Sequence, residues 1–368
     1  MRVHLIIACV VGLQAALAPH RCDAGAFTFA SEGTPDVITH PAGYYGAGGP
    51  LEVTVCIDPS SAYVTQMEPT IRNVVATFNA LLPTVDNIRS GSSNNVPNGH
   101  LDFESVALHE VGHCLGMAHP NAATESGLPS SQRDYTRAGD GPNNTYNLNA
   151  GSDGVIGSGD DVRGDDVNLH WFRRADNDPF AIAPIVDTST YARNTSQLPP
   201  GHSFAANGGR DVAALLGLPP TEAVMQQLTF FDEAQRSFAA DDVATLQLAS
   251  AGLDRTAGTP DDYTLSLRYV GRTTACDIVV AFSTAASLAF CQVTASYIAP
   301  NHLTISSADV RFNPNFNWFF NPAPPTATPT RTPTRSATPT RTPTTTPTHT
   351  PTRTPTSTPT ATPSPTPT

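Results

Sequence analysis

Residues 109–119 read His109-Glu110-Val111-Gly112-His113-Cys114-Leu115-Gly116-Met117-Ala118-His119, a complete H-E-x-x-H-x-x-G-x-x-H pattern. Residues at i and i+4 share one face of a helix, so His109 and His113 can bind one metal ion together. Gly116 allows the helix to end and the chain to turn, which brings His119 in as a third ligand. Three neutral imidazoles leave a fourth position open for water, as in catalytic zinc sites. The pattern therefore predicts a zinc ion on the three histidines, with Glu110 beside it as a general base.

The residues before the pattern are also typical of a helix. Asp102 can serve as the N-cap residue. Apolar side chains follow on the side away from the metal face, at Phe103, Val106, Ala107, Leu108 and Val111.

The pattern is the signature of the metzincin metallopeptidases, and this chain resembles that family. Met225 resembles the methionine of the turn that lies beneath the zinc in metzincins. The stretch 236–247, with its Asp241-Asp242 pair, resembles the segment that follows this turn in the matrixin branch. The resemblance implies that Met225 lies under the ligands without binding the metal. It also implies that residues 226–238 line the pocket for the substrate residue after the cut, where Leu228, Phe230 and Phe231 suggest an apolar pocket.

The fold class implied by this resemblance is α+β. We expect a metzincin-like zincin catalytic domain, with a twisted mixed sheet and an active-site helix, a long irregular insert and a C-terminal β-rich segment. Two features depart from the matrixin pattern. About a hundred residues separate His119 from Met225, and a predicted first helix, from Glu68 to about Leu82, is followed by only about twenty residues before Asp102. Strands that matrixins place between these two helices are missing from that position.

Four segments are predicted along the chain. Residues 1–24 resemble a secretory signal peptide, with Arg2, an apolar run from Leu5 to Leu17 and cleavage after Ala24. Residues 25–252 form the catalytic domain, with the insert at about 120–220. Residues 253–322 are β-rich, and residues 323–368 are a disordered Thr/Pro-rich linker. The signal predicts a secreted, extracellular protein, and no later segment is apolar for long enough to span a membrane.

The β-rich segment shows alternating or short apolar runs at 263–270, 277–282 and 288–297. Two arrangements are open. The segment can form a separate small β-domain, or it can return to complete the catalytic sheet. The second is suggested by residues 308–313, which resemble the strand that matrixins place before the zinc helix.

Four cysteines remain after the predicted leader, and an even number in an exported protein suggests disulfides. Cys276 and Cys291 flank a predicted hairpin and are expected to pair. Cys56 and Cys114 would then form the second bond.

Two loops share the pattern A-G-x-D-x-x-x-G-[S/T]-x-D-D. Carboxylates on a glycine-bent loop are what Ca²⁺ requires, so calcium is a second possible cofactor. The alternative is a solvated Asp/Gly turn used twice. The candidate ligands are Asp153, Asp160 and Asp161 in the first loop, and Asp254, Asp261 and Asp262 in the second.

The formal net charge is −12 at pH 7, and the sequence contains no lysine. An acidic chain argues against nucleic acid and anionic membranes as partners. The Thr/Pro repeat is expected to be an extended spacer, which suggests attachment to a cell surface.

These observations predict a secreted zinc-dependent endopeptidase that acts on a protein or peptide substrate, with Glu110 as the base that activates the zinc-bound water. The alternative is a non-catalytic zinc-bearing binding or adhesion module displayed on the Thr/Pro stalk. The intact Glu110 argues against the alternative, because a binding-only site has no need of a base.

Overall fold

The computed structural model describes residues 5–6, 10–11, 27–30, 34, 36–119, 170–176, 178–194, 197, 208–226, 228–284 and 287–322. All of them belong to one structural unit, which ends at Thr328. Most of the predicted leader, much of the insert and the whole Thr/Pro repeat lie outside the described residues. The first candidate calcium loop, with Asp153, Asp160 and Asp161, lies outside them too.

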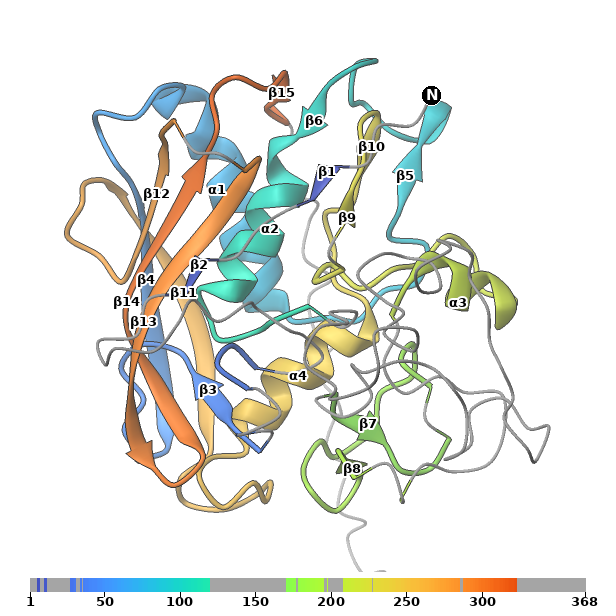
Figure 1. The fold of residues 1–368 in the computed structure, drawn as a ribbon, viewed down its shortest axis with the longest axis vertical. Helices are drawn as coiled ribbons and strands as arrows, with labels where there is room; N and C mark the ends of the chain where they lie inside the picture. The colour runs from blue at the N-terminus through green and yellow to red at the C-terminus, as the bar shows by residue number, and fades with distance from the viewer. Residues whose placement is uncertain are drawn as a thin grey trace, which may run out of the picture. The chain divides into compact units, whose positions relative to one another are not determined.

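The centre of the fold is a mixed, mostly parallel sheet (Figure 1). The β13–β14 pair is antiparallel, and the other pairs of this sheet are parallel. In spatial order its strands are β11 (Tyr263–Arg272), β4 (Gly49–Ile57), β12 (Ile278–Phe282), β14 (His302–Phe312), β13 (Ala289–Ala299) and β2 (Val10–Val11), and β3 (Ile38–His40) also pairs with β14.

Helices α1 (Val64–Ala80) and α2 (Phe103–His113) lie against one face of this sheet, and α4 (Ala240–Ser250) lies beside β3 (Figure 1). The buried positions of α1 include Met67, Ile71, Val74 and Phe78, which recur at the three- and four-residue spacing of one helix face. This face and the inner side chains of β4 and β12 form the main core together with α2. The sheet and α1 thus hold α2 in place.

Shorter elements complete the described fold. A short helix α3 spans Arg210–Leu215, and a 3₁₀ turn spans Gly91–Ser93. The two-stranded pairs are β1 (Leu5–Ile6) with β9 (Leu228–Thr229), β5 (Arg89–Ser90) with β10 (Glu233–Ala234), β6 (Leu101–Asp102) with β15 (Trp318–Phe319), and β7 (Phe172–Arg173) with β8 (Tyr191–Ala192). In the described part, none of the helices has the length and apolar character needed to cross a membrane.

The C-terminal β-rich segment belongs to the same sheet as β4. Strand β11 pairs with β4 along its length, and β12 pairs with the other edge of β4. β4 thus lies between two strands that come from the far end of the described chain. The coarse expectation of a mixed sheet packed against helices is confirmed.

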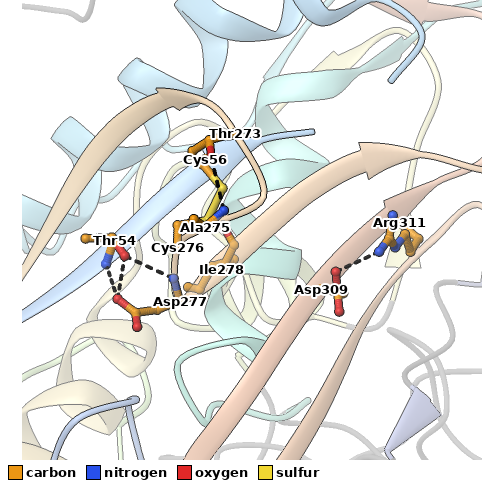
Figure 2. The surroundings of a disulfide bond; sticks show 9 residues. All are labelled: Thr54, Cys56, Thr273, Ala275, Cys276, Asp277, Ile278, Asp309 and Arg311. Carbon is orange, nitrogen blue, oxygen red and sulfur yellow. Dashed lines mark hydrogen bonds and ion pairs between the residues drawn. A yellow bond between two sulfur atoms is a disulfide. The ribbon is translucent and has the colours of Figure 1, made fainter. Parts of the chain in front are cut away.

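The predicted disulfide pairing is wrong. The bonds join Cys56 to Cys276, with Cα atoms 6.1 Å apart, and Cys114 to Cys291, with Cα atoms 5.9 Å apart. The prediction assumed that β12 and β13 form a hairpin, but β14 lies between them. Cys276 instead precedes β12, where that strand pairs with β4 and Cys56 (Figure 2).

A hydrogen-bonded clamp lies beside the Cys56–Cys276 bond (Figure 2). The backbone N–H and the hydroxyl of Thr54 donate to the Asp277 carboxylate at 2.7 and 2.5 Å, and the Asp277 N–H donates back to that hydroxyl at 3.0 Å. The clamp and the disulfide together fix the start of β12 against β4.

Candidate metal centre

Helix α2 begins at a capped and charge-paired N-terminus. The Asp102 carboxylate accepts a hydrogen bond from the Ser105 N–H at 3.0 Å, which confirms the predicted N-cap. Arg236 binds the same carboxylate through Nε at 2.9 Å and a terminal nitrogen at 2.7 Å. A two-point arginine–carboxylate contact fixes direction as well as distance. It therefore holds the start of α2 against the segment that follows Met225.

The three histidines of the pattern meet at one point. Nε2 of His113 lies 3.0 Å from Nε2 of His109 and 3.0 Å from Nε2 of His119, and the remaining pair is 3.1 Å apart. All three side chains are buried. For comparison, the nitrogen ligands of a tetrahedral zinc ion lie about 3.3 Å from one another, which is close to these separations. Within the described residues, this is the group of histidine, cysteine and carboxylate side chains that could hold a metal ion.

Gly116 makes the turn that carries His119 to the site. Its φ of +100° is in the left-handed region, which side-chain-bearing residues rarely adopt. A Cβ atom there would lie against the Thr39 carbonyl of β3, closer than side chains ever approach backbone. The glycine of the pattern is thus required both by the turn and by contact with the sheet.

Backbone carbonyls orient two of the imidazoles. Nδ1 of His109 donates to the Val224 carbonyl at 2.7 Å, and Nδ1 of His113 donates to the Met117 carbonyl at 2.9 Å. A proton on Nδ1 leaves Nε2 unprotonated, so its lone pair is available to a metal ion. These two contacts therefore select the tautomer that can bind a metal.

Met225 lies directly beneath α2. A Cβ atom added at Gly112, between the two helical histidines, would be 2.5 Å from the Met225 sulfur. The Asp242 carboxylate, near the start of α4, accepts hydrogen bonds from the N–H groups of Val224 at 2.9 Å and Met225 at 3.1 Å. The turn at Val224 and Met225 is thus bound to the start of α4, and burial raises the pKa of Asp242 to about 6.

Burial favours neutral side chains throughout the site. It lowers the pKa of His109 to about 4, and together with neighbouring imidazoles it lowers those of His113 and His119 well below the usual value. Neutral imidazole is the form that binds a metal ion. The Glu110 carboxyl is fully buried, which raises its pKa well above the usual value, and the nearby Cys291 backbone opposes part of that rise.

A pocket opens beside His109, between α2 and the segment after Met225. It is a small hollow that is partly open to solvent. Phe230 lines it as predicted, but polar groups line it too. The lining residues are Ser105, Val106, His109, Val224, Thr229, Phe230, Glu233 and Gln235.

The second candidate calcium loop gathers its carboxylates around one hydroxyl. Thr259 Oγ1 lies 3.3 Å from an oxygen of Asp254, 2.7 Å from one of Asp261 and 3.1 Å from one of Asp262. Backbone N–H groups of the loop also donate to these carboxylates, as Leu253 does to Asp261 at 2.5 Å. The loop therefore satisfies its own carboxylates, and calcium binding stays a prediction.

Some contributors to the site were not predicted from the sequence. They are the Val224 carbonyl, the two-point contact of Arg236 with Asp102, and the pair His170–Asp241. In that pair, Nε2 of His170 and Oδ1 of Asp241 are 3.0 Å apart. His170 is the first described residue after residues 120–169, and the pair is buried. The Asp241-Asp242 pair in the sequence was the available signal for the contact between Asp241 and His170.

Comparison with known proteins gave no match: no family model, no curated protein and no solved structure resembles this chain significantly.

Proposed function

We propose that this chain is a secreted, zinc-dependent endopeptidase that resembles the metzincins. The observation that carries the proposal is the convergence of three Nε2 atoms within 3.0–3.1 Å of one another, with Glu110 next to His109 on the same helix. Three imidazole nitrogens suit zinc, and a three-histidine set leaves a coordination position open.

The donor set fits a metal ion on physical grounds. Three unprotonated nitrogens in contact would repel one another through their lone pairs, and burial disfavours the protonation that could relieve this. A cation at the centre would satisfy all three. When bound there, zinc would supply an acidified water molecule and polarise the substrate carbonyl.

Glu110 would move the proton. Its carboxylate would accept a proton from the attacking water and deliver it to the nitrogen of the departing amine. Burial raises the pKa of this carboxyl, so its conjugate acid holds the proton until the amine departs, and a neighbouring cation would oppose part of that rise.

Two strand edges flank the site and suit an extended peptide. Strand β9 borders the pocket beside His109, and β13 carries Cys291, which is bonded to Cys114 just after α2. β1 pairs with β9 and β2 pairs with β13, and both short strands come from the predicted leader. Removal of the leader would leave both edges with unpaired backbone groups. An extended substrate could then pair with them by strand addition.

Two disulfides are compatible with an extracellular protein, and the predicted leader would direct the chain out of the cell. The partner we propose is therefore an unfolded or flexible extracellular polypeptide. The predicted Thr/Pro repeat would display the enzyme at a surface.

The proposal is tested by hydrolysis of casein by the chain purified after leader removal. We expect cleavage that stops when a zinc-selective chelator is added and returns when zinc is restored. Stoichiometric zinc binding with no cleavage of casein or of a random peptide library would instead support the non-catalytic binding module.

A further inference from the structure

We propose that the pocket beside His109 selects a basic side chain of the substrate, and that Glu233 is the residue that determines this preference. The inference rests on the proposed peptidase function and goes beyond it, because it names the substrate class. The pocket lies between His109, a predicted metal ligand, and β10.

One arginine at the pocket wall is shared by two glutamates. Terminal nitrogens of Arg210 donate to the Glu233 carboxylate at 2.8 Å each. Nε and a terminal nitrogen of Arg210 donate to Glu222 at 2.9 and 2.5 Å, and its backbone N–H donates to Glu222 at 3.1 Å. Two carboxylates thus face one guanidinium, which leaves one negative charge uncompensated within this cluster.

The glutamate that faces the pocket with this uncompensated charge is Glu233. The Glu222 side chain is buried, whereas Glu233 lines the pocket. The Arg210 guanidinium stacks on the Phe230 ring, 4.3 Å from its centre, so Arg210 is held by three partners. A carboxylate offers about four acceptor positions, and Arg210 occupies two of those on Glu233. Glu233 can therefore accept further hydrogen bonds from a charged ligand group.

The rest of the lining suits a long basic side chain. Val106, Val224 and Phe230 can contact its aliphatic stem, and Ser105, Thr229 and Gln235 add polar groups around its charged end. This differs from the apolar pocket that the sequence suggested. A purely apolar side chain would leave the Glu233 charge partly desolvated and without a new partner, which costs affinity.

The test compares peptides that are identical except at the residue after the scissile bond, where they carry Arg, Leu or Glu. For the zinc-loaded protein we expect kcat/KM for Arg to exceed that for Leu by about tenfold, with Glu poorest. In Glu233→Gln the ratio of Arg to Leu should fall close to one. The metal's own charge is the same in both proteins, so the change in ratio isolates Glu233.

Glu52→Gln is the matched control, because Glu52 is paired with Arg268 at 2.8 Å on the exposed surface, and its replacement should leave the ratio unchanged. Glu233→Asp keeps the charge and should keep the preference for Arg. Binding of the same peptides to zinc-loaded Glu110→Gln gives a readout without turnover, and the Arg peptide should bind tightest. Cleavage or binding that favours Leu over Arg would overturn this inference and leave the peptidase proposal intact. If no peptide is cleaved but the Arg peptide still binds tightest, the result contradicts the proposed peptidase function and supports the preference for a basic side chain.

Discussion

His109 and Asp242 bind opposite ends of the same backbone residue, Val224. The Val224 carbonyl accepts the Nδ1 proton of His109 at 2.7 Å, and its N–H donates to the Asp242 carboxylate at 2.9 Å. A predicted metal ligand on α2 is thus coupled to α4 by two hydrogen bonds. This relay fixes the direction of the imidazole before any metal arrives, and such outer contacts influence metal affinity.

Asp242→Asn should weaken zinc binding. The amide keeps one acceptor oxygen, but Asp242 accepts from Val224, Met225 and Ala239, so at least one N–H loses its partner. We expect the zinc Kd, measured by competition with a chromogenic chelator, to rise about 10- to 100-fold. Asp241→Asn is the control, because Asp241 contacts His170 instead of the methionine turn. Equal effects of the two substitutions would count against the relay.

Disulfide mapping should find Cys56 bonded to Cys276 and Cys114 bonded to Cys291. The second bond ties the turn after α2 to β13 across 177 residues of sequence. Replacing Cys114 and Cys291 together by serine should lower the free energy of unfolding by about 4–5 kcal/mol, because the unfolded chain is no longer closed into a large loop and gains conformational entropy. Non-reducing peptide mapping and chemical denaturation provide the two measurements. A peptide containing Cys276 joined to Cys291 would contradict the strand order.

Acid should destabilise the fold through His40 and His302. Their rings are buried, with Nε2 of His40 2.9 Å from Nδ1 of His302. Burial and the neighbouring His302 lower the pKa of His40 to about 3, while burial and nearby Arg255 lower that of His302 to about 4. An unfolded histidine titrates near pH 6.5, so between these values the unfolded chain holds more protons. These two histidines should therefore lower the free energy of unfolding as pH drops from about 6.5 towards 4, and their contribution is up to about 2.7 kcal/mol per pH unit for two protons.

Denaturation curves between pH 7 and 5 would measure this slope, on chelator-treated protein so that metal release does not contribute. His302→Gln should make the slope shallower. His100→Gln, a loop histidine outside the cluster, should leave it unchanged. An unaltered slope in His302→Gln would show that the pair does not titrate on unfolding.

The local parts of this structure could be predicted because they depend on residues close in sequence. The spacing of the histidines, the cap at Asp102 and the need for a turn at Gly116 all follow from helix geometry. The apolar runs likewise predicted strands close to the observed β11, β12 and β13. Met225 was predicted only from the resemblance to the metzincins, and the structure places its sulfur beside Gly112.

The long-range parts could not be predicted in the same way. An alternating pattern shows that a segment is a strand, but it does not specify which strand lies beside it. For this reason the sequence predicts a bond between Cys276 and Cys291 across a hairpin of β12 and β13. In the structure β14 lies between these two strands, and Cys276 is bonded to Cys56. The Glu233–Arg210 contact spans 23 residues and depends on an irregular chain path, so no periodic signal reports it.

The most direct test of the central claim compares the intact protein with Glu110→Gln, which has nearly the same shape but no base. Zinc content and casein hydrolysis are measured on the same samples, with Glu68→Gln, a partly exposed residue on α1, as the control. The account predicts one zinc per chain in all three proteins, normal hydrolysis by the control, and a loss of at least about a hundredfold in Glu110→Gln. Undiminished hydrolysis by a folded, zinc-loaded Glu110→Gln protein would contradict it.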